Sequence, residues 1–320
     1  MRLITYDNHH IYAYGSSEPL TFLPQPSVVT VGSYDGVHCG HRVILSRLVE
    51  VAHQNNLRSV VVTFEPHPRT VLKGALTGPL GLLTTLEEKS DLLAAAAVDL
   101  LFVVRFTHDF AARTSDDFIR NVLVGLLGAE RIIVGYDHAF GRDRSGSHNT
   151  LERLGNELHF GVEVIDEVLI GNEHLSSTRI RKLLQDGRIE EVNEFLGSPY
   201  LITGRVVQGA QLGRTIGFPT VNLQFHPAKL LPRYGVYFAR TMVQGVPYMA
   251  LMNIGKRPTV SSNGDATIEA HLLGFEGSLY GEELRFSILR FIRDEKRFAS
   301  LEALQEQLEK DKKAVEMYLE

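Results

Sequence analysis

The sequence predicts an α/β domain followed by an antiparallel β-barrel domain, because the pattern of apolar residues changes near residue 199. Before that point, short apolar runs alternate with amphipathic helical segments, which is typical of a doubly wound parallel sheet. From Tyr200 onward, short strands are separated by turns rich in Gly, Pro and Asn, and a final helix follows Ser300. The expected division is a first domain at 1–186, a linker at 187–199 and a barrel domain at 200–320.

Length and composition set further limits. The chain has 320 residues, of which 44% are hydrophobic and 22% charged, as in a globular protein with room for two cores. A net charge of −5 argues against a general nucleic-acid or membrane-surface binder. With Cys39 as the one cysteine, an intrachain disulfide and a thiolate-rich zinc site are both excluded. The start of the chain lacks the pattern of a signal peptide, so we expect a cytoplasmic protein.

The first domain should contain five buried parallel strands with helices between them. The strands are expected near Val28–Val31, Ser59–Phe64, Leu100–Phe106, Arg131–Gly135 and Val162–Asp166. The barrel strands are expected near Leu201–Val207, Gly235–Val243, Pro247–Ile254, Thr267–Leu273 and Glu283–Phe291. Ligands of a parallel sheet bind at the carboxyl ends of its strands, so the turns that follow the first set are candidate sites.

The turn after the first strand carries the strongest signal of the first domain. Gly32 and Gly36 allow backbone N–H groups to approach an anion, and the helix expected from about Val43 adds partial positive charge. His38 and His41 flank Gly40 and can add donors or charge. We favour a phosphate site. The two alternatives are ordinary turn histidines and a metal site, although the latter would need further ligands.

Two other segments of the first domain can contribute charge. The loop from Gly135 to Gly146 follows a strand and contains Asp137, Arg142 and Arg144, although charged loops are often merely solvated. The segment Leu175–Arg181 places three hydroxyl residues before two arginines. It can form an anion cradle or a plain helix N-cap.

The second domain has its own glycine-rich loop, which runs from Gly209 to Asn222. Three glycines supply N–H groups, and Arg214 adds charge. Thr220 and Asn222 alternate to one side if the chain is extended, so both could reach one cation. A bare glycine-rich loop can also be purely structural.

The motifs together resemble a known family. GSYDGVHCGH, FEPHP, VGYDHAFG and LSSTRIR, in this order, resemble the nucleotidyltransferase half of the bacterial bifunctional riboflavin kinase/FAD synthetases, a HIGH-motif nucleotidyltransferase. The span G-R-x-x-G-F-P-T-x-N resembles the loop of their riboflavin kinase half, and further motifs match downstream in the same order. The resemblance therefore covers nearly the whole chain.

This resemblance implies a Rossmann-like first domain and two ATP-dependent reactions. Riboflavin would be phosphorylated to FMN, and AMP would then pass from ATP to FMN, giving FAD and pyrophosphate, with Mg²⁺ as cofactor. It implies catalytic roles for His38, His41 and Glu269, and Mg²⁺ ligands at Thr220 and Asn222. It implies ATP or phosphate binding by Gly32, Asp35, Gly36, Gly40, Ser176, Ser177, Thr178, Arg181, Gly213, Arg214, Gly217 and Pro219. It implies flavin binding by Asp137, Phe140 and Arg293.

The chemistry of the two reactions differs. The FMN phosphate has a second pKa of about 6, so it is largely dianionic at neutral pH and needs no general base. The riboflavin 5′-hydroxyl must lose a proton, so a carboxylate such as Glu269 is useful. A glutamate in an apolar strand is otherwise expected to be a solvent-facing residue of the alternation.

Three rival functions remain. Ser33 and Tyr34 stand where family members usually carry a pair such as Asn-Phe, which is compatible with a riboflavin kinase whose adenylyltransferase half is weakened or inactive. A flavin-binding regulatory protein on the same folds is a second rival, but it would need no catalytic base. A nucleotidyltransferase with another acceptor would leave residues 200–320 unexplained. We expect no nucleic-acid partner, and the sequence leaves a homo-oligomer open.

Overall fold

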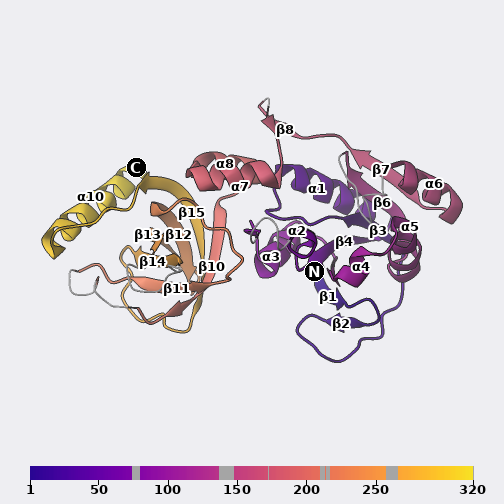
Figure 1. Ribbon diagram of the computed structural model, residues 1–320, viewed down its shortest axis with the longest axis horizontal. Helices are drawn as coiled ribbons and strands as arrows, with labels where there is room; N and C mark the ends of the chain where they lie inside the picture. The colour runs from indigo at the N-terminus through magenta and orange to yellow at the C-terminus, as the bar shows by residue number, and fades with distance from the viewer. Residues whose placement is uncertain are drawn as a thin grey trace. The chain divides into compact units, whose positions relative to one another are not determined.

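The chain forms two compact units in a computed structural model (Figure 1). The structure describes residues 1–73, 80–136, 148–171, 173–209, 213, 217–256 and 266–319. The first unit comprises Met1–Leu80 and Leu86–Ser176. The second comprises Gly81–Thr85 and Ser177–Glu320, so a short segment from the first half of the sequence belongs to the second unit.

A seven-stranded sheet forms the centre of the first unit, in the order β2-β1-β5-β4-β3-β6-β7. All neighbouring strands are parallel except β2, which is antiparallel to β1. The strands are β1 (Arg2–Tyr6), β2 (Ile11–Ala13), β3 (Ser27–Val31), β4 (Arg58–Glu65), β5 (Leu100–Arg105), β6 (Ala129–Gly135) and β7 (Gly161–Ile165). The predicted doubly wound sheet is confirmed, and β1 and β2 are additional to the strands that we expected.

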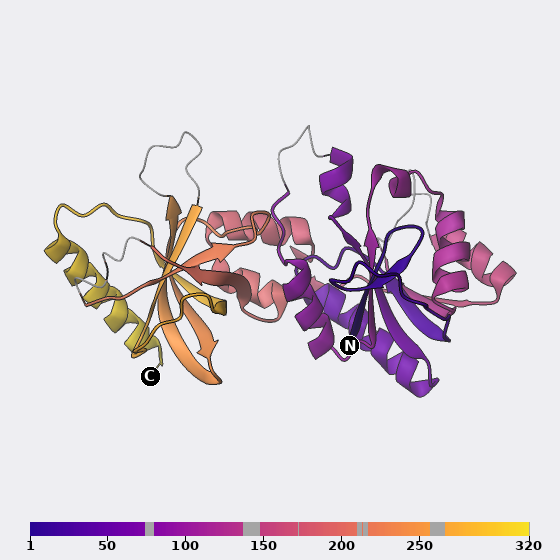
Figure 2. The same cartoon turned by 90° about the horizontal axis from the view of Figure 1, so that it is seen from below.

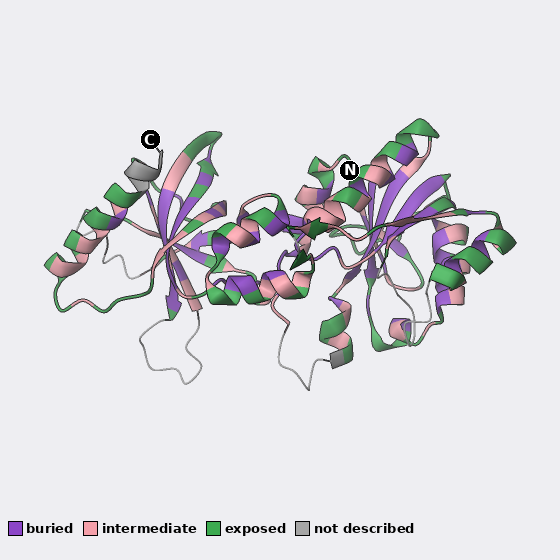
Figure 3. Cartoon of the chain, turned by 90° about the horizontal axis from the view of Figure 1, so that it is seen from above, coloured by how far each residue is buried: buried purple, intermediate pink, exposed green. Residues whose placement is uncertain are grey.

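Helices cover both faces of this sheet. They are α1 (Cys39–Gln54), α2 (Pro68–Lys73), α3 (Leu86–Ala95), α4 (His108–Ala111), α5 (Ser115–Asp117), the π-helix η1 (Phe118–Leu126) and α6 (His148–Leu158). One face packs against α1 and α3 through residues such as Leu45 and Leu93. The other face packs against α4, η1 and α6 through Phe110, Phe118 and Leu151. Figure 3 shows that the strands between these layers are largely buried.

The strand order reverses at β3. From β3 the chain passes to β4 and β5 on one side of the sheet, and then to β6 and β7 on the other. Because β3 pairs in parallel with β6, the segments that follow both strands begin at the same edge of the sheet. The turn after β3 is therefore at the topological switch point, where ligands of such sheets usually bind.

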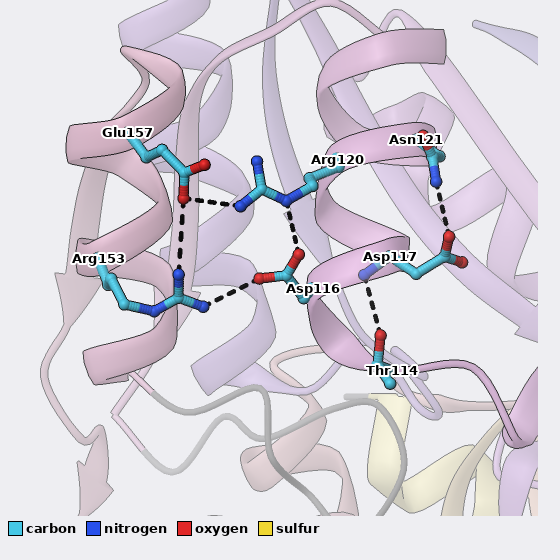
Figure 4. Close-up of polar contacts among 7 residues, drawn as sticks. All are labelled: Thr114, Asp116, Asp117, Arg120, Asn121, Arg153 and Glu157. Atoms are coloured by element: carbon cyan, nitrogen blue, oxygen red, sulfur yellow. Dashed lines mark hydrogen bonds and ion pairs between the residues drawn. The ribbon is translucent and has the colours of Figure 1, made fainter.

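A surface ion-pair network joins α5 and η1 to α6 (Figure 4). Asp116 contacts Arg120 at 2.6 Å and Arg153 at 2.9 Å, and Glu157 contacts Arg120 at 2.7 Å and Arg153 at 3.6 Å. We call these four residues the η1–α6 network. A small hairpin of β8 (Leu169–Ile170) and β9 (Glu173–His174) follows β7.

The second unit contains a closed antiparallel barrel in the order β10-β11-β14-β13-β12-β15 (Figure 2). Its strands are β10 (Tyr200–Val207), β11 (Val221–Phe225), β12 (Gly235–Val243), β13 (Val246–Lys256), β14 (Ala266–Leu272) and β15 (Glu283–Arg293). The barrel closes because β15 pairs with both β10 and β12. The predicted barrel and its C-terminal helix, α10 (Leu301–Leu319), are confirmed, and β11 is a sixth strand that we did not expect.

Two helices and one inserted segment complete this unit. They are α7 (Ser177–Asp186), α8 (Ile189–Leu196) and residues 81–85. The stretch 187–199 thus includes a helix, and Asn193 of that helix donates to the carbonyl of Ile288 in β15 at 2.9 Å.

The inserted segment, residues 81–85, is held in the second unit by backbone pairing and by the buried side chain of Lys229. Leu82 forms a parallel bridge with Lys229, whose Nζ donates to the carbonyl of Leu83 at 2.7 Å. The same Nζ lies 4.3 Å from the ring centroid of Tyr200.

Candidate active sites

The turn between β3 and α1 has an unusual backbone. Tyr34, Gly36 and Val37 have φ angles of 46°, 92° and 42°, and positive φ is uncommon for residues with a Cβ. A Cβ on Gly32 would lie 2.9 Å from Cε2 of Tyr34, so this close approach requires glycine. The buried Tyr34 ring is held by a 2.6 Å hydrogen bond between its hydroxyl and that of Thr30. Backbone strain of this kind concentrates at functional sites.

His38 and His41 form a stacked pair in this turn. Their ring centroids are 3.6 Å apart with an interplanar angle of 15°, and the His41 ring also packs on Tyr34 at 4.9 Å. His38 is the N-cap of α1, and its Nδ1 accepts a hydrogen bond from the backbone N–H of His41 at 3.3 Å. The proton of neutral His38 is therefore on Nε2.

Both imidazoles are neutral at neutral pH. Burial lowers the pKa of His38 to about 4. Burial also lowers the pKa of His41 well below its usual value, and the charges of His38 and Lys89 act in the same direction. We expected these histidines to supply hydrogen-bond donors or positive charge. Because both rings are neutral, they can donate N–H groups but cannot supply positive charge. Within the described part of the chain, the buried Nδ1 of His41 has no hydrogen-bond partner.

Two further residues of the first predicted site, Asp35 and Gly40, lie beside the histidine pair. Asp35 is buried in the turn, and Gly40 is in the first turn of α1, where a Cβ would lie 3.4 Å from both the His38 ring and Cδ2 of Leu175. The structure therefore brings the start of the Leu175–Arg181 motif beside the histidine pair.

The remaining residues of that motif are divided between the units. Ser176 ends the first unit, whereas Ser177, Thr178 and Arg181 are in α7 of the second, and Arg181 Nε donates to the carbonyl of Gly81 at 2.8 Å. Asp137 and Phe140, with Arg142 and Arg144, lie outside the described residues.

The second predicted site lies on neighbouring barrel strands. Asn222 of β11 is directly opposite Glu269 of β14, which in turn is opposite Asn253 of β13. Residues directly opposite one another project from the same face of a sheet. Because Ile268 and Ala270 are buried in the barrel, the intervening Glu269 points to the other face.

The glycine-rich loop packs closely against Asn222. A Cβ on Gly209 would lie 2.2 Å from Nδ2 of Asn222, which is itself only 9% exposed. Gly213 accepts a hydrogen bond from the N–H of Phe218 at 2.8 Å, and the ring of His271 contacts the carbonyl of Pro219 at 2.8 Å. The last two contacts hold the backbone that leads into Thr220. Gly217 has a φ of 80°, and Arg214 lies outside the described residues.

Arg293 is part of an ion pair at the end of β15. Its Nε and Nη2 contact the carboxylate of Asp311 in α10, at distances down to 2.7 Å. Gln307 donates to the same carboxylate at 2.8 Å. The arginine that we expected at the flavin therefore also anchors the C-terminal helix.

The donor atoms of the second site suit Mg²⁺. Thr220, Asn222 and Glu269 carry hydroxyl, amide and carboxylate oxygens, which are the hard ligands that Mg²⁺ prefers. Among the described residues, no group of three or more His, Cys, Asp or Glu side chains could hold a metal ion. A few protein oxygens combined with substrate phosphates are the usual way in which proteins bind Mg²⁺.

A histidine turn at the switch point of an α/β sheet, together with a barrel that carries a glycine loop and a carboxylate, defines an enzyme of two nucleotide-dependent domains. A family model described as FAD synthetase matches residues 22–179, and one described as riboflavin kinase matches residues 196–319. The chain belongs to the family of bifunctional riboflavin kinase/FMN adenylyltransferases. It is a kinase and nucleotidyltransferase that converts riboflavin to FMN and FMN to FAD with ATP.

Relatives carrying that name are similar over most of their length. The protein from Escherichia coli K12 is 39% identical over 89% of this chain and 90% of its own. The proteins from Listeria monocytogenes and Bacillus subtilis are 36% and 34% identical over 89% and 91% of this chain, and over 90% and 92% of their own.

A solved structure supports the fold over the whole chain. A crystal structure from Streptococcus pneumoniae, described as a macrolide-efflux protein, has a TM-score of 0.83 and 30% identity, and covers 98% of both chains. That description belongs to the other protein. In the described part of this chain, no helix has the length and apolar character needed to span a membrane.

The structure also reveals a residue that sequence reasoning missed. Lys89 of α3 is buried, and its Nζ donates to the carbonyl of Ser33 in the β3–α1 turn at 2.7 Å. The sequence offered no clear signal, because Lys89 stands among the polar residues Glu87, Glu88, Ser90 and Asp91, and lysine is almost never fully buried unless it is paired.

Proposed function

We propose that the two reactions take place at separate sites, adenylyl transfer at the β3–α1 turn and phosphorylation of riboflavin beside Asn222 and Glu269. The observation that carries this division is the difference in chemistry between the two places. The first presents neutral imidazoles, whereas the second presents a carboxylate opposite a side-chain amide. Only phosphorylation of an alcohol requires a base.

At the β3–α1 turn, adenylyl transfer needs charge stabilisation and in-line positioning. His38 and His41 donate N–H groups to the α-phosphate and the leaving pyrophosphate. The backbone N–H groups of the turn, with Gly32, Gly36 and Gly40, act at the same point, and Asp35 borders the nucleotide. Further contacts to the β- and γ-phosphates come from Ser176, Ser177, Thr178 and Arg181, while Asp137 and Phe140 contact FMN.

In the barrel, Glu269 accepts the proton of the riboflavin 5′-hydroxyl as that oxygen attacks the γ-phosphate of ATP, and ADP leaves as the bond between the γ-phosphorus and the β–γ bridging oxygen breaks. Thr220 and Asn222 would hold Mg²⁺, which neutralises phosphate charge when bound. The loop through Gly213, Arg214, Gly217 and Pro219 covers the phosphates, and Arg293 borders the flavin. We also propose that the enzyme acts in the cytoplasm, where ATP is available, and that nucleic acid is not a partner.

A pair of variants tests the two-site assignment, because each activity is the folding control for the other. His41→Ala should lower FAD formation from FMN by about 10²–10³-fold, the usual cost of losing a donor to developing charge. It should leave FMN formation nearly intact. Glu269→Gln should do the reverse. Parallel loss of both activities in a folded variant would refute the separation of the sites.

A product analysis excludes the rival functions. The wild-type protein is incubated with riboflavin, ATP and Mg²⁺, and the flavins are then separated. Formation of FMN followed by FAD is expected. Accumulation of FMN alone would indicate an inactive adenylyltransferase half, and unchanged riboflavin would indicate a binding protein.

A further inference from the structure

Lys89 occupies a position where an apolar residue would be expected. Its side chain comes from α3, which packs on the sheet through residues such as Leu93, and the residue is only 4% exposed. Burying an ammonium group is costly unless it forms hydrogen bonds. The ammonium group of Lys89 must therefore form hydrogen bonds with specific partners, and those partners indicate its role.

Both hydrogen-bond partners of Lys89 belong to the edge of the sheet that carries the histidine pair. Nζ donates to the carbonyl of Ser33 at 2.7 Å and to Oγ1 of Thr63 at 3.3 Å. The Thr63 hydroxyl donates to the same Ser33 carbonyl at 3.1 Å. Two side chains from α3 and β4 thus fix one carbonyl, immediately before the residues with positive φ.

The charges around Lys89 also meet at this turn. Burial lowers the pKa of Lys89, whereas Asp35 of the turn and Glu65 of β4 favour its charged form. The charge of Lys89 acts in turn on His41, where it opposes protonation. His38 acts on His41 in the same direction, and the phenol of Tyr34, which packs on the His41 ring, stays neutral because burial raises its pKa. The lysine therefore helps to keep His41 neutral.

We propose that Lys89 is a positioning residue for adenylyl transfer, which fixes the Ser33 carbonyl and supplies a buried positive charge beside the histidine pair. The inference rests on the assignment of adenylyl transfer to the β3–α1 turn. Fixing the carbonyl fixes the peptide plane between Ser33 and Tyr34, and with it the start of the turn that leads to the histidine pair. The charge adds a stationary cation close to a reaction in which every substrate phosphate is negative.

The principal variant is Lys89→Met, which removes the charge and the donor at similar volume. We expect kcat for FAD formation from FMN to fall by about 10²-fold, because Lys89 acts on the orientation of transition-state donors. The KM for FMN should change far less. Phosphorylation of riboflavin by the same protein should remain within about twofold of wild type.

Two matched variants separate this role from simple stability. Thr63→Val removes the second hydrogen bond to Ser33 and leaves the charge in place. Lys229→Met makes the same substitution at the other buried lysine that donates to a carbonyl, and should leave kcat for FAD formation within about twofold of wild type. Histidine-ring NMR, with the His41 signal assigned from His41→Ala, should show a raised pKa of His41 in Lys89→Met and an unchanged pKa in Thr63→Val.

The outcomes are distinct. Wild-type kcat for FAD formation and an unshifted His41 signal in Lys89→Met would overturn the proposal, provided that His41→Ala is impaired. If His41→Ala also forms FAD normally, the site assignment itself has failed. Should Lys89→Met not fold, Lys89→Gln retains a donor and removes the charge. A raised pKa of His41 with reduced kcat in that variant supports the proposal, and wild-type values of both refute it.

Discussion

Gly209→Ala should disable the kinase without a change in any polar group. The φ of Gly209 is outside the left-handed range, so alanine is compatible with its backbone. The added Cβ would nevertheless lie 2.2 Å from Nδ2, 2.4 Å from Cγ and 2.6 Å from Oδ1 of Asn222. The whole amide of the proposed Mg²⁺ ligand is therefore in the space that the methyl group needs.

The size of the effect follows from these distances. Moving from 2.2 Å to an ordinary contact of 3.4 Å requires a relative shift of about 1.2 Å between the loop and the amide. A misplacement of about 1 Å in a catalytic constellation can cost about 10²-fold in rate. We therefore expect kcat for FMN formation to fall by about 10²-fold, which corresponds to about 2.7 kcal/mol in activation free energy.

The assay is a double-mutant cycle in riboflavin phosphorylation, with FAD formation from supplied FMN as the control. If Gly209→Ala acts by displacing Asn222, combining it with Asn222→Ala should cost no more than Asn222→Ala alone, because residues in contact are not additive. The Mg²⁺ concentration needed for half-maximal rate should rise in each single variant. Fully additive losses, or a single variant with normal kinase activity, would refute the reasoning.

Three further predictions concern stability. Asp311→Ala removes the buried carboxylate that pairs with Arg293, whose side chain is 14% exposed, and should lower the free energy of barrel unfolding by about 3–5 kcal/mol, measured by urea denaturation; a loss under 1 kcal/mol would contradict this. Asp116→Ala breaks two pairs of the exposed η1–α6 network (Figure 4) and should cost less than about 1 kcal/mol, with the cost shrinking in high salt. His38 is neutral and buried, so its contribution to stability is complete above pH 6.5 and is lost as the pH falls towards 4. The stability advantage of wild type over His38→Gln should therefore decrease by about 3 kcal/mol across that window, and a pH-independent difference would contradict the assignment.

The sequence predicted those features whose signals are local. The run Val28–Val31 consists of β-branched residues that are all buried, so its identity as a central strand could be read directly. The start of α1 was placed about four residues late, since the helix begins at Cys39 and not near Val43. Its N-cap is His38, which caps through a ring nitrogen, and histidine is not among the residues that signal a helix start.

Other features depend on partners that are distant in sequence. The strand β11 contains Asn222 and Gln224 and follows Pro219, so it has little local strand character, and its pairing with β10 and β14 determines it. Residues 81–85 join the barrel unit through a backbone bridge to Lys229, and backbone pairing leaves no trace in residue types. Sequence reasoning also expects lysines to be exposed, so it assigned no role to this residue.

The pH dependence of adenylyl transfer should be set by the acceptor phosphate and not by the histidine pair. Both histidines are neutral at neutral pH because burial lowers the pKa of His38 to about 4 and that of His41 well below its usual value. The acid limb of adenylyl transfer should therefore follow the FMN phosphate, whose second pKa is about 6. An acceptor analogue with a more acidic phosphonate should move this limb to lower pH, whereas His38→Gln should not move it. If the acid limb of the pH–rate profile instead shifts in His38→Gln and stays in place with the analogue, an imidazole changes protonation during catalysis.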